Sequence, residues 1–152
     1  IANRFLRTDG NGTLSFSRPA DYVGVSAYFA FNFRRIISST SFVEMEAPVY
    51  SNGQGYKMPV AGEVTHMTIQ FDVTAFTSTD SVYLRLFKNG SYTGKFIGSD
   101  NTTGIGDFSG TAEITPEAYN AGDTLSLYIA HKSGLMTTEN HVALIRIVED
   151  AS

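Results

Sequence analysis

The sequence predicts an all-β protein, an antiparallel jelly-roll β-sandwich preceded by a short N-terminal hairpin. Three observations predict this class. Apolar and polar residues alternate in several short segments, as in strands that bury one face. Turn-forming residues separate these segments at short intervals, which is typical of sandwiches and jelly rolls. No segment shows a sustained helical period, so we expect no long helix.

The stretch from Gly53 to Val73 carries the clearest pattern. Gly and Pro open it and predict a turn that leads into a strand. Alternate residues of that strand form an apolar face: Met67, Ile69, Phe71 and Val73. The residues between them form a polar face: His66, Thr68, Gln70 and Asp72. We expect the apolar face to pack against the other strands.

The N-terminal segment, residues 4–17, predicts a hairpin. Its centre reads D-G-N-G, and such residues adopt the positive φ angles of tight hairpin turns. Residues 18–21 break the alternation and predict a junction. We therefore expect residues 1–20 to be a hairpin at the junction with a shaft, and residues 21–152 to be the jelly-roll head.

Residues 22–35 predict a long strand with a break or bulge near Ala30. Further along, residues 42–45 predict a short strand and residues 77–81 a polar turn. The pair Asn89-Gly90 predicts a two-residue hairpin turn. The composition of residues 98–106 predicts a mobile surface loop.

The C-terminal third predicts three more strands, at residues 108–114, 125–129 and 142–148. Between them we expect one helical turn at 116–119, a turn at 121–123 and a loop at 133–140. The last strand is apolar on both faces, which predicts that both faces are covered. The cover is either a second sheet of the same chain or another subunit.

Composition narrows the function. The net charge of −4 gives no electrostatic case for binding nucleic acid. No apolar stretch is long enough to predict insertion into a membrane. The chain has no cysteine, which excludes disulfides and thiolate chemistry. Only 17% of the residues are charged, which suits a chain that hides part of its surface in an oligomer. Because the chain begins at Ile1, we expect it to be a piece of a longer protein.

Four phrases, in order, resemble the head or tip domains of tailed-bacteriophage fibres and virion appendages. They are L-R-T-D-G-N-G-T-L-S-F at Leu6 to Phe16, Y-K-M-P-V-A-G-E-V-T at Tyr56 to Thr65, F-K-N-G at Phe87 to Gly90 and A-G-D-T-L-S-L at Ala121 to Leu127. The last phrase is also similar to complement- and tumour-necrosis-factor-like trimers. The resemblance implies a homotrimer in a virion, outside the cell, that is joined on its N-terminal side to a fibre shaft or virion protein. Most such phage hairpins carry Trp where this chain has Phe16, and residues 20–50 match nothing specific.

Catalytic, metal and cofactor sites are not predicted. The three histidines are unpaired in sequence, so we expect isolated side chains rather than a metal site on a threefold axis. The segment from Asp9 to Thr13 begins like a calcium loop, but Ala20 stands where the last acidic ligand belongs. Acidic residues are scattered singly, and no nucleophile motif is present, so we expect no enzyme.

Aromatic and amide side chains in the predicted loops suggest a receptor site instead. Aromatic rings stack on sugars, and amides donate to and accept from their hydroxyls. The candidates are Tyr50, Asn52, Gln54, Tyr56, Asn89, Tyr92 and Asn101. The candidates for an oligomer interface are Tyr22, Tyr28, Val142, Leu144 and Val148.

The favoured hypothesis is a non-enzymatic, trimeric fibre head that binds a glycan or another envelope component of a host cell. One alternative is a capsid decoration or head-fibre protein without a receptor. A second is a carbohydrate-binding module of a secreted protein, which would be a monomer with an aromatic groove.

Overall fold

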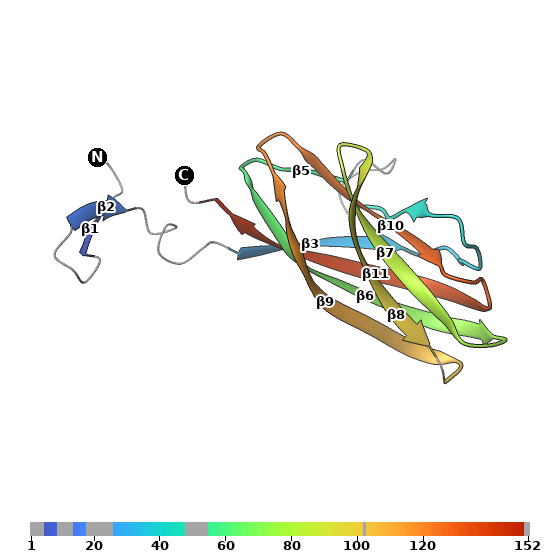
Figure 1. Cartoon of the computed structure of the whole chain (residues 1–152). Helices are drawn as coiled ribbons and strands as arrows, with labels where there is room; N and C mark the ends of the chain where they lie inside the picture. The colour runs from blue at the N-terminus through green and yellow to red at the C-terminus, as the bar shows by residue number, and fades with distance from the viewer. Residues whose placement is uncertain (1–4, 9–13, 18–25, 48–54, 102, 151–152) are drawn as a thin grey trace.

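The protein is described by a computed structural model, which covers residues 5–8, 14–17, 26–47, 55–101 and 103–150 (Figure 1). The regular elements of these residues are all strands. They are β1 (Phe5–Thr8), β2 (Leu14–Ser17), β3 (Ser26–Phe33), β4 (Val43–Glu44), β5 (Tyr56–Lys57), β6 (Gly62–Phe76), β7 (Asp80–Lys88), β8 (Ser91–Asn101), β9 (Gly106–Tyr119), β10 (Thr124–His131) and β11 (Met136–Glu149).

Strands β1 and β2 form a two-stranded antiparallel sheet of their own, with Phe5 opposite Ser17 and Thr8 opposite Leu14. This pairing confirms the predicted N-terminal hairpin. The turn between the strands and the junction at residues 18–21 lie outside the described residues. The domain boundary at residue 20 therefore stays a prediction.

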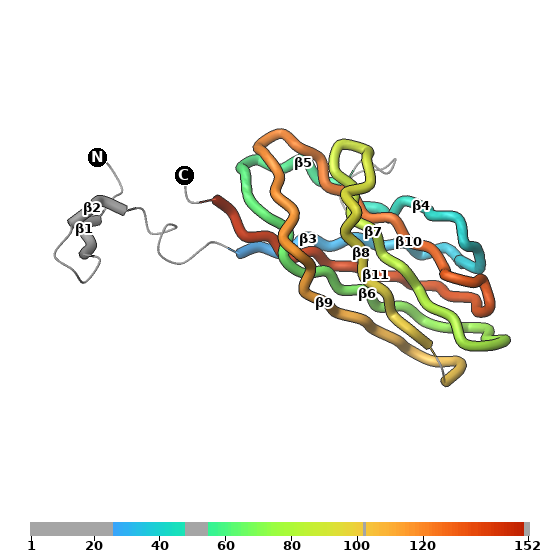
Figure 2. Tube along the Cα trace, viewed as in Figure 1, coloured from blue at the N-terminus to red at the C-terminus, as the bar shows by residue number. Residues whose placement is uncertain are grey.

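The remaining strands form two antiparallel sheets, with the orders β3-β11-β6-β9 and β4-β10-β7-β8. Strand β5 also pairs with β10. The pairing is nested: β3 pairs with β11, β4 and β5 with β10, β6 with β9, and β7 with β8. Figures 1 and 2 show the two sheets lying one over the other. Nested antiparallel pairs folded into two sheets make a jelly roll, so the predicted fold is confirmed.

The core lies between the inner faces of the two sheets. The apolar side chains predicted to face inward from the 53–73 stretch are buried: Met67, Ile69, Phe71 and Val73. The opposite sheet contributes alternating residues of β7 and β10, also fully buried: Val82, Leu84, Leu86, Leu125, Leu127 and Ile129. Strict alternation therefore encodes the inner face of each sheet.

Strand β11 lies at the centre of its sheet, between β3 and β6. Its inward residues, Ala143, Ile145 and Ile147, are 0% exposed. On the outward side, Val142 is 43% exposed. The described residues therefore cover the inward face of β11 fully and its outward face only in part.

The hairpin between β7 and β8 turns at Asn89 and Gly90, as predicted. Their φ angles are 52° and 78°. Two consecutive positive φ angles are the signature of a type I′ turn, which matches the twist of the flanking strands. Asn tolerates this conformation better than most residues, and Gly adopts it freely.

The predicted strand at 22–35 is shorter in the described residues, because β3 covers only Ser26–Phe33. Residues 22–25 lie outside them. The predicted bulge near Ala30 is wrong: β3 pairs with β11 without interruption from Ser26 to Phe33. The register shifts lie instead where β11 meets β6. Sequence alone does not tell which of two paired strands takes up the irregularity.

The loop predicted at 98–106 is wrong over its first part, because β8 continues to Asn101. Asn101 is 0% exposed. Its Oδ1 accepts from the backbone N–H of Thr103 at 2.9 Å and of Gly104 at 3.1 Å, and its Nδ2 donates to the Gly104 carbonyl at 2.8 Å. Asn101, within the predicted mobile loop, is thus a buried side chain that holds the backbone of Thr103 and Gly104.

Two further predictions in the C-terminal third are wrong. Residues 116–119 form the end of β9 rather than a helical turn. Strand β9 is at the edge of its sheet, where Pro116 needs no ladder partner for its missing N–H. The loop predicted at 133–140 ends early because β11 begins at Met136, which is buried. A register shift between Glu139 and Val142, and a φ of 53° at Asn140, interrupt the alternation there.

We predict that Leu127→Ala lowers the free energy of unfolding by about 2–5 kcal/mol, because it leaves a cavity between the sheets. Thr115→Ala, at an exposed position of β9, should change it by less than about 0.5 kcal/mol. Urea denaturation followed by circular dichroism measures both. Equal losses in the two variants would contradict the placement of the core.

Candidate functional site

The outward face of the β3-β11-β6-β9 sheet, here called the apolar outer face, gathers most of the predicted interface residues. The register places Leu144 opposite Ala30, Arg146 opposite Tyr28, and Val148 opposite Ser26. On the other side of β11, Leu144 lies opposite Thr68. The structure thus brings Tyr28, Val142, Leu144 and Val148 onto one surface; Tyr22 lies outside the described residues.

This face is open in the single chain. Tyr28 is 66% exposed and Val142 is 43% exposed. The alternative that a second sheet of the same chain covers it is therefore wrong for the described residues. Because exposed apolar side chains that are contiguous on one face mark interaction sites, the apolar outer face is a candidate interface.

Polar side chains frame the apolar centre of this face. The guanidinium of Arg146 donates from Nη1 to Thr65 Oγ1 at 3.2 Å and from Nη2 to Ser26 Oγ at 3.0 Å. The hydroxyls of Thr68 and Thr111 share a hydrogen bond of 3.0 Å. Arg146 is the charged group at this position, and its guanidinium is satisfied by two neutral hydroxyls of the same face.

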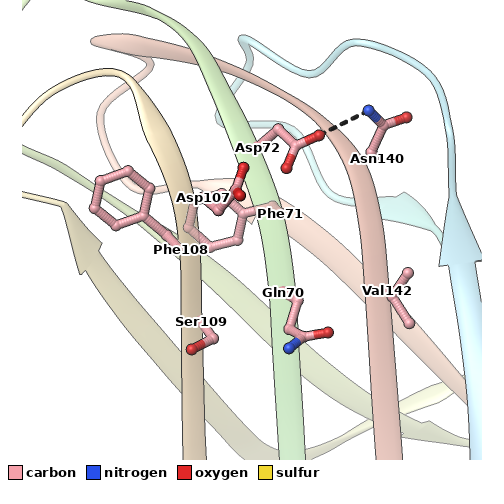
Figure 3. A pocket seen from close by; sticks show the side chains of 8 residues that line it. All are labelled: Gln70, Phe71, Asp72, Asp107, Phe108, Ser109, Asn140 and Val142. Carbon is pink, nitrogen blue, oxygen red and sulfur yellow. Dashed lines mark hydrogen bonds between the residues drawn. The ribbon is translucent and has the colours of Figure 1, made fainter.

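A pair of carboxylates lies at one end of the same sheet. Asp72 and Asp107 are cross-strand partners, and Asn140 Nδ2 donates to Asp72 Oδ2 at 2.8 Å (Figure 3). The hydrogen bond from the side-chain amide of Asn140 lowers the pKa of Asp72. Interaction with Asp72 raises the pKa of Asp107. Sequence reasoning missed the pair because its members are far apart in the chain.

Asp72 and Asp107 stand directly opposite each other on β6 and β9; Asp107 is exposed and Asp72 is half-buried. The raised pKa of Asp107 favours its protonated form, which reduces repulsion between the two carboxyl groups.

Three of the predicted receptor residues have structural partners. Tyr56 donates its hydroxyl to the Ala30 carbonyl at 2.7 Å and packs edge-on against Phe29 and Phe31. Asn89 Nδ2 donates to Asp123 Oδ1 at 2.8 Å, which joins two turns. Asn101 is buried, as described above. Their polar groups are thus engaged within the fold.

Among the receptor candidates that the structure describes, Tyr92 has a solvent-exposed ring and is 39% exposed. It lies on the outward face of the second sheet, beside Phe87 and Arg85. Tyr50, Asn52 and Gln54 lie outside the described residues. The described residues therefore do not bring the predicted receptor residues together into one loop site. Tyr92, which the sequence analysis placed in a loop, lies in strand β8.

Two histidines meet inside the sandwich, where sequence reasoning expected isolated side chains. Thr138 Oγ1 lies 2.8 Å from His131 Nε2 and 2.7 Å from His141 Nε2. His141 Nδ1 lies 2.9 Å from the Phe33 carbonyl oxygen. The carbonyl can only accept, so His141 donates from Nδ1 and accepts the Thr138 hydroxyl proton at Nε2. Thr138 in turn accepts from His131 Nε2, while His131 Nδ1 has no hydrogen-bond partner among the described residues.

Burial favours the neutral rings. It lowers the pKa of both His131 and His141 below the usual value. Asp80 Oδ2 lies 3.4 Å from His131 Nδ1. Although burial raises the pKa of Asp80, backbone N–H groups of Leu135, Ser81 and Ser133 outweigh it and hold the pKa low. Asp80 thus accepts hydrogen bonds from the turn that leads into β11 and stabilises it.

The described residues include no cluster of three or more His, Asp or Glu side chains that could hold a metal ion. Nor do they include a helix with the length and apolar character needed to cross a bilayer.

Comparisons with known proteins give similarities of fold and none of sequence. No protein-family model matches the chain, and no curated protein matches it in sequence. Among solved structures, the structure of Eiger TNF from S. frugiperda is similar over 82% of this chain and 96% of that chain, with 13% identity and a TM-score of 0.47. The jelly-roll assignment itself follows from the nested strand pairing.

We predict that Thr138→Val lowers the free energy of unfolding by about 1–3 kcal/mol, because it leaves two buried ring nitrogens without a partner. Thr74→Val, at an exposed site on β6, is the matched control and should have little effect. Urea denaturation measures both. A Thr138→Val variant as stable as the parent would contradict the hydrogen-bonded chain.

Stability should fall as the pH drops from 7.5 to 5.5. Histidine in the unfolded chain has a pKa of about 6.5, whereas burial lowers the pKa of His131 and His141 in the fold. The unfolded state therefore binds more protons below about pH 6.5, and the stability present above this pH is lost below it.

The midpoint of urea denaturation, measured across this pH range, tests whether stability depends on the protonation of these histidines. His141→Gln should flatten the pH dependence, whereas His66→Gln, on the outward face of β6, should leave it unchanged. If the midpoint rises toward pH 5.5, the assignment of neutral rings is wrong.

Proposed function

We propose that this chain is the non-enzymatic, homotrimeric head of a virion fibre or appendage, located outside the cell, which binds a receptor on a host surface. The observation that carries the proposal is the apolar outer face, which the single chain leaves uncovered on its central strand. A second and a third copy of the chain are the occupants we propose for it.

The chemistry of this face supports association with identical copies. It carries Tyr28, Val142 and Leu144, and around them Arg146 and the hydroxyls of Ser26, Thr68 and Thr111. Interfaces that form between copies of one chain have such an apolar centre and polar rim. Around a threefold axis the same patch on each subunit can meet its neighbours and close the assembly.

The virion assignment is supported by the four sequence phrases that resemble phage fibre heads. Three of them lie wholly in the described residues: the phrase at Tyr56 to Thr65 covers β5 and the start of β6, F-K-N-G lies at the β7–β8 hairpin, and A-G-D-T-L-S-L forms the turn into β10. A trimeric head presents three copies of any receptor site, so weak individual contacts gain strength by avidity. The N-terminal hairpin would join the head to a fibre shaft or virion protein.

We predict that the protein has the mass of three 16.5-kDa chains in solution, and keeps it on tenfold dilution from micromolar concentration. Val142→Glu should convert it to a monomer, because three added carboxylates would approach one another in the interface. Multi-angle light scattering measures the mass, and circular dichroism verifies the fold.

Phe96→Glu is the matched control, because Phe96 is 54% exposed on the other sheet. This variant should remain trimeric. A wild-type protein that is a clean monomer would overturn the trimeric head and favour the carbohydrate-binding module, for which the open aromatic rings of the second sheet are the supporting observation.

A further inference from the structure

The outward face of the β4-β10-β7-β8 sheet, here called the aromatic outer face, has a different chemistry from the apolar outer face. Residues of β7 that alternate with the buried Val82, Leu84 and Leu86 point outward, and their cross-strand partners join them. The aromatic members of this face are Phe42, Tyr83, Phe87, Tyr92, Phe96 and Tyr128.

These rings form two groups in contact, Tyr83 with Phe96 and Phe87 with Tyr92 and Tyr128. Ring centroids are 5.8 Å apart for Tyr83 and Phe96, 5.6 Å for Phe87 and Tyr92, and 4.0 Å for Phe87 and Tyr128. Phe96 remains 54% exposed and Tyr92 39% exposed. Gly98 contributes to the flatness, because a Cβ there would lie 2.9 Å from the Tyr83 ring.

Arg85 lies at the centre of this surface. Its guanidinium carbon is 3.8 Å from the ring centroid of Phe42 and 4.7 Å from that of Tyr92. The ion pairs found among the described residues join other groups, so no described carboxylate neutralises this cation. Stacking over rings orients a guanidinium while leaving its N–H groups at the edge, where they can bind a carboxylate with two parallel hydrogen bonds.

A carboxylate stands on the same face as an acceptor. Glu44 pairs with Tyr128 across the strands, and the Tyr128 hydroxyl donates to Glu44 Oε2 at 3.1 Å. The surface therefore combines aromatic rings, the guanidinium of Arg85, and the hydrogen-bonded pair of Tyr128 and Glu44; Tyr128 is the cross-strand neighbour of Arg85.

We propose that the aromatic outer face binds acidic glycans, that is, chains of pyranose sugars that carry carboxylates. The rings of Tyr92 and Phe96 stack on the apolar faces of the sugars, and Arg85 pairs with a sugar carboxylate. Glu44 and the tyrosine hydroxyls bond to sugar hydroxyls. This inference rests on the proposed receptor-binding function and supplies the chemical class of its receptor.

Two observations favour this occupant over a second copy of the chain. The unpaired charge of Arg85 calls for an anion, and the carboxylate described on this face, Glu44, already accepts a hydrogen bond from the Tyr128 hydroxyl of its own chain. In addition, the aromatic outer face lies on the opposite side of the sandwich from the apolar outer face. Trimer formation through the apolar face would leave it open, with three copies available to one long polymer.

The test is isothermal titration calorimetry of the intact protein with polygalacturonate and with polysialic acid, and with neutral dextran for comparison. We expect at least one acidic polymer to bind, dextran to bind at least tenfold more weakly, and the affinity to fall as the salt concentration rises. Failure of both acidic polymers to bind, or equal binding of dextran, overturns the inference.

Variants then locate the site. Arg85→Gln should weaken acidic-polymer binding at least tenfold, Arg85→Lys should weaken it less, and Phe96→Ala should weaken it several-fold. Lys132→Gln removes an exposed cation at the end of β10 and is the charge-matched control, which should bind normally. Equal losses for Lys132→Gln and Arg85→Gln would show nonspecific attraction and overturn the inference. Circular dichroism verifies that each variant is folded.

Light scattering on the same samples separates this inference from the proposed function. A trimer that binds neither acidic polymer overturns the glycan site and leaves the trimeric head in place. A monomer that binds through Arg85 overturns the trimeric head and supports the glycan site. If Phe96→Glu changes the mass of the assembly, the aromatic outer face is occupied by another copy, and the glycan site is wrong.

Discussion

The packing of the inward face of β11 against the opposite sheet is the constraint on which the rest of the structure depends. Ala143, Ile145 and Ile147 are fully buried in the middle of their sheet. Because strand residues alternate, fixing these three inward forces Val142, Leu144 and Val148 outward. The outward set is also apolar, so the register that completes the core also creates the uncovered surface. Core formation and association are thus coupled through one strand.

The two sheets of the sandwich turn chemically different faces to the outside. One carries aliphatic side chains with a rim of hydroxyls, which suits contact with copies of the same chain. The other carries aromatic rings around Arg85, which suits a flat, anionic ligand. A jelly roll allows two different binding surfaces because its two outer faces point in opposite directions. One face can be covered while the other remains exposed to solvent.

The polar groups inside the sandwich make hydrogen bonds that stabilise the ends of strands. Asp80 accepts the backbone N–H groups of Ser133 and Leu135, and Asn101 closes the turn after β8. The chain from His131 through Thr138 to His141 ties β10 to β11 and β3. Most of these groups are buried with hydrogen-bond partners, which is the condition under which polar side chains are tolerated in a core; His131 Nδ1 is the exception among them. They stabilise the irregular start of β11, where the register with β6 shifts.

The sequence by itself determined the properties that are written within single strands and turns. Alternation predicted the inward face of β6, and Asn89-Gly90 predicted its hairpin, because these patterns depend on backbone geometry over a few residues. Pairing between distant segments was decided only by the tertiary structure. It left the outer side of β11 open, buried Asn101, joined two histidines through Thr138, and gathered Phe42, Arg85 and Tyr92 on one face. Such contacts depend on which strands become neighbours, and local alternation carries no information about that choice.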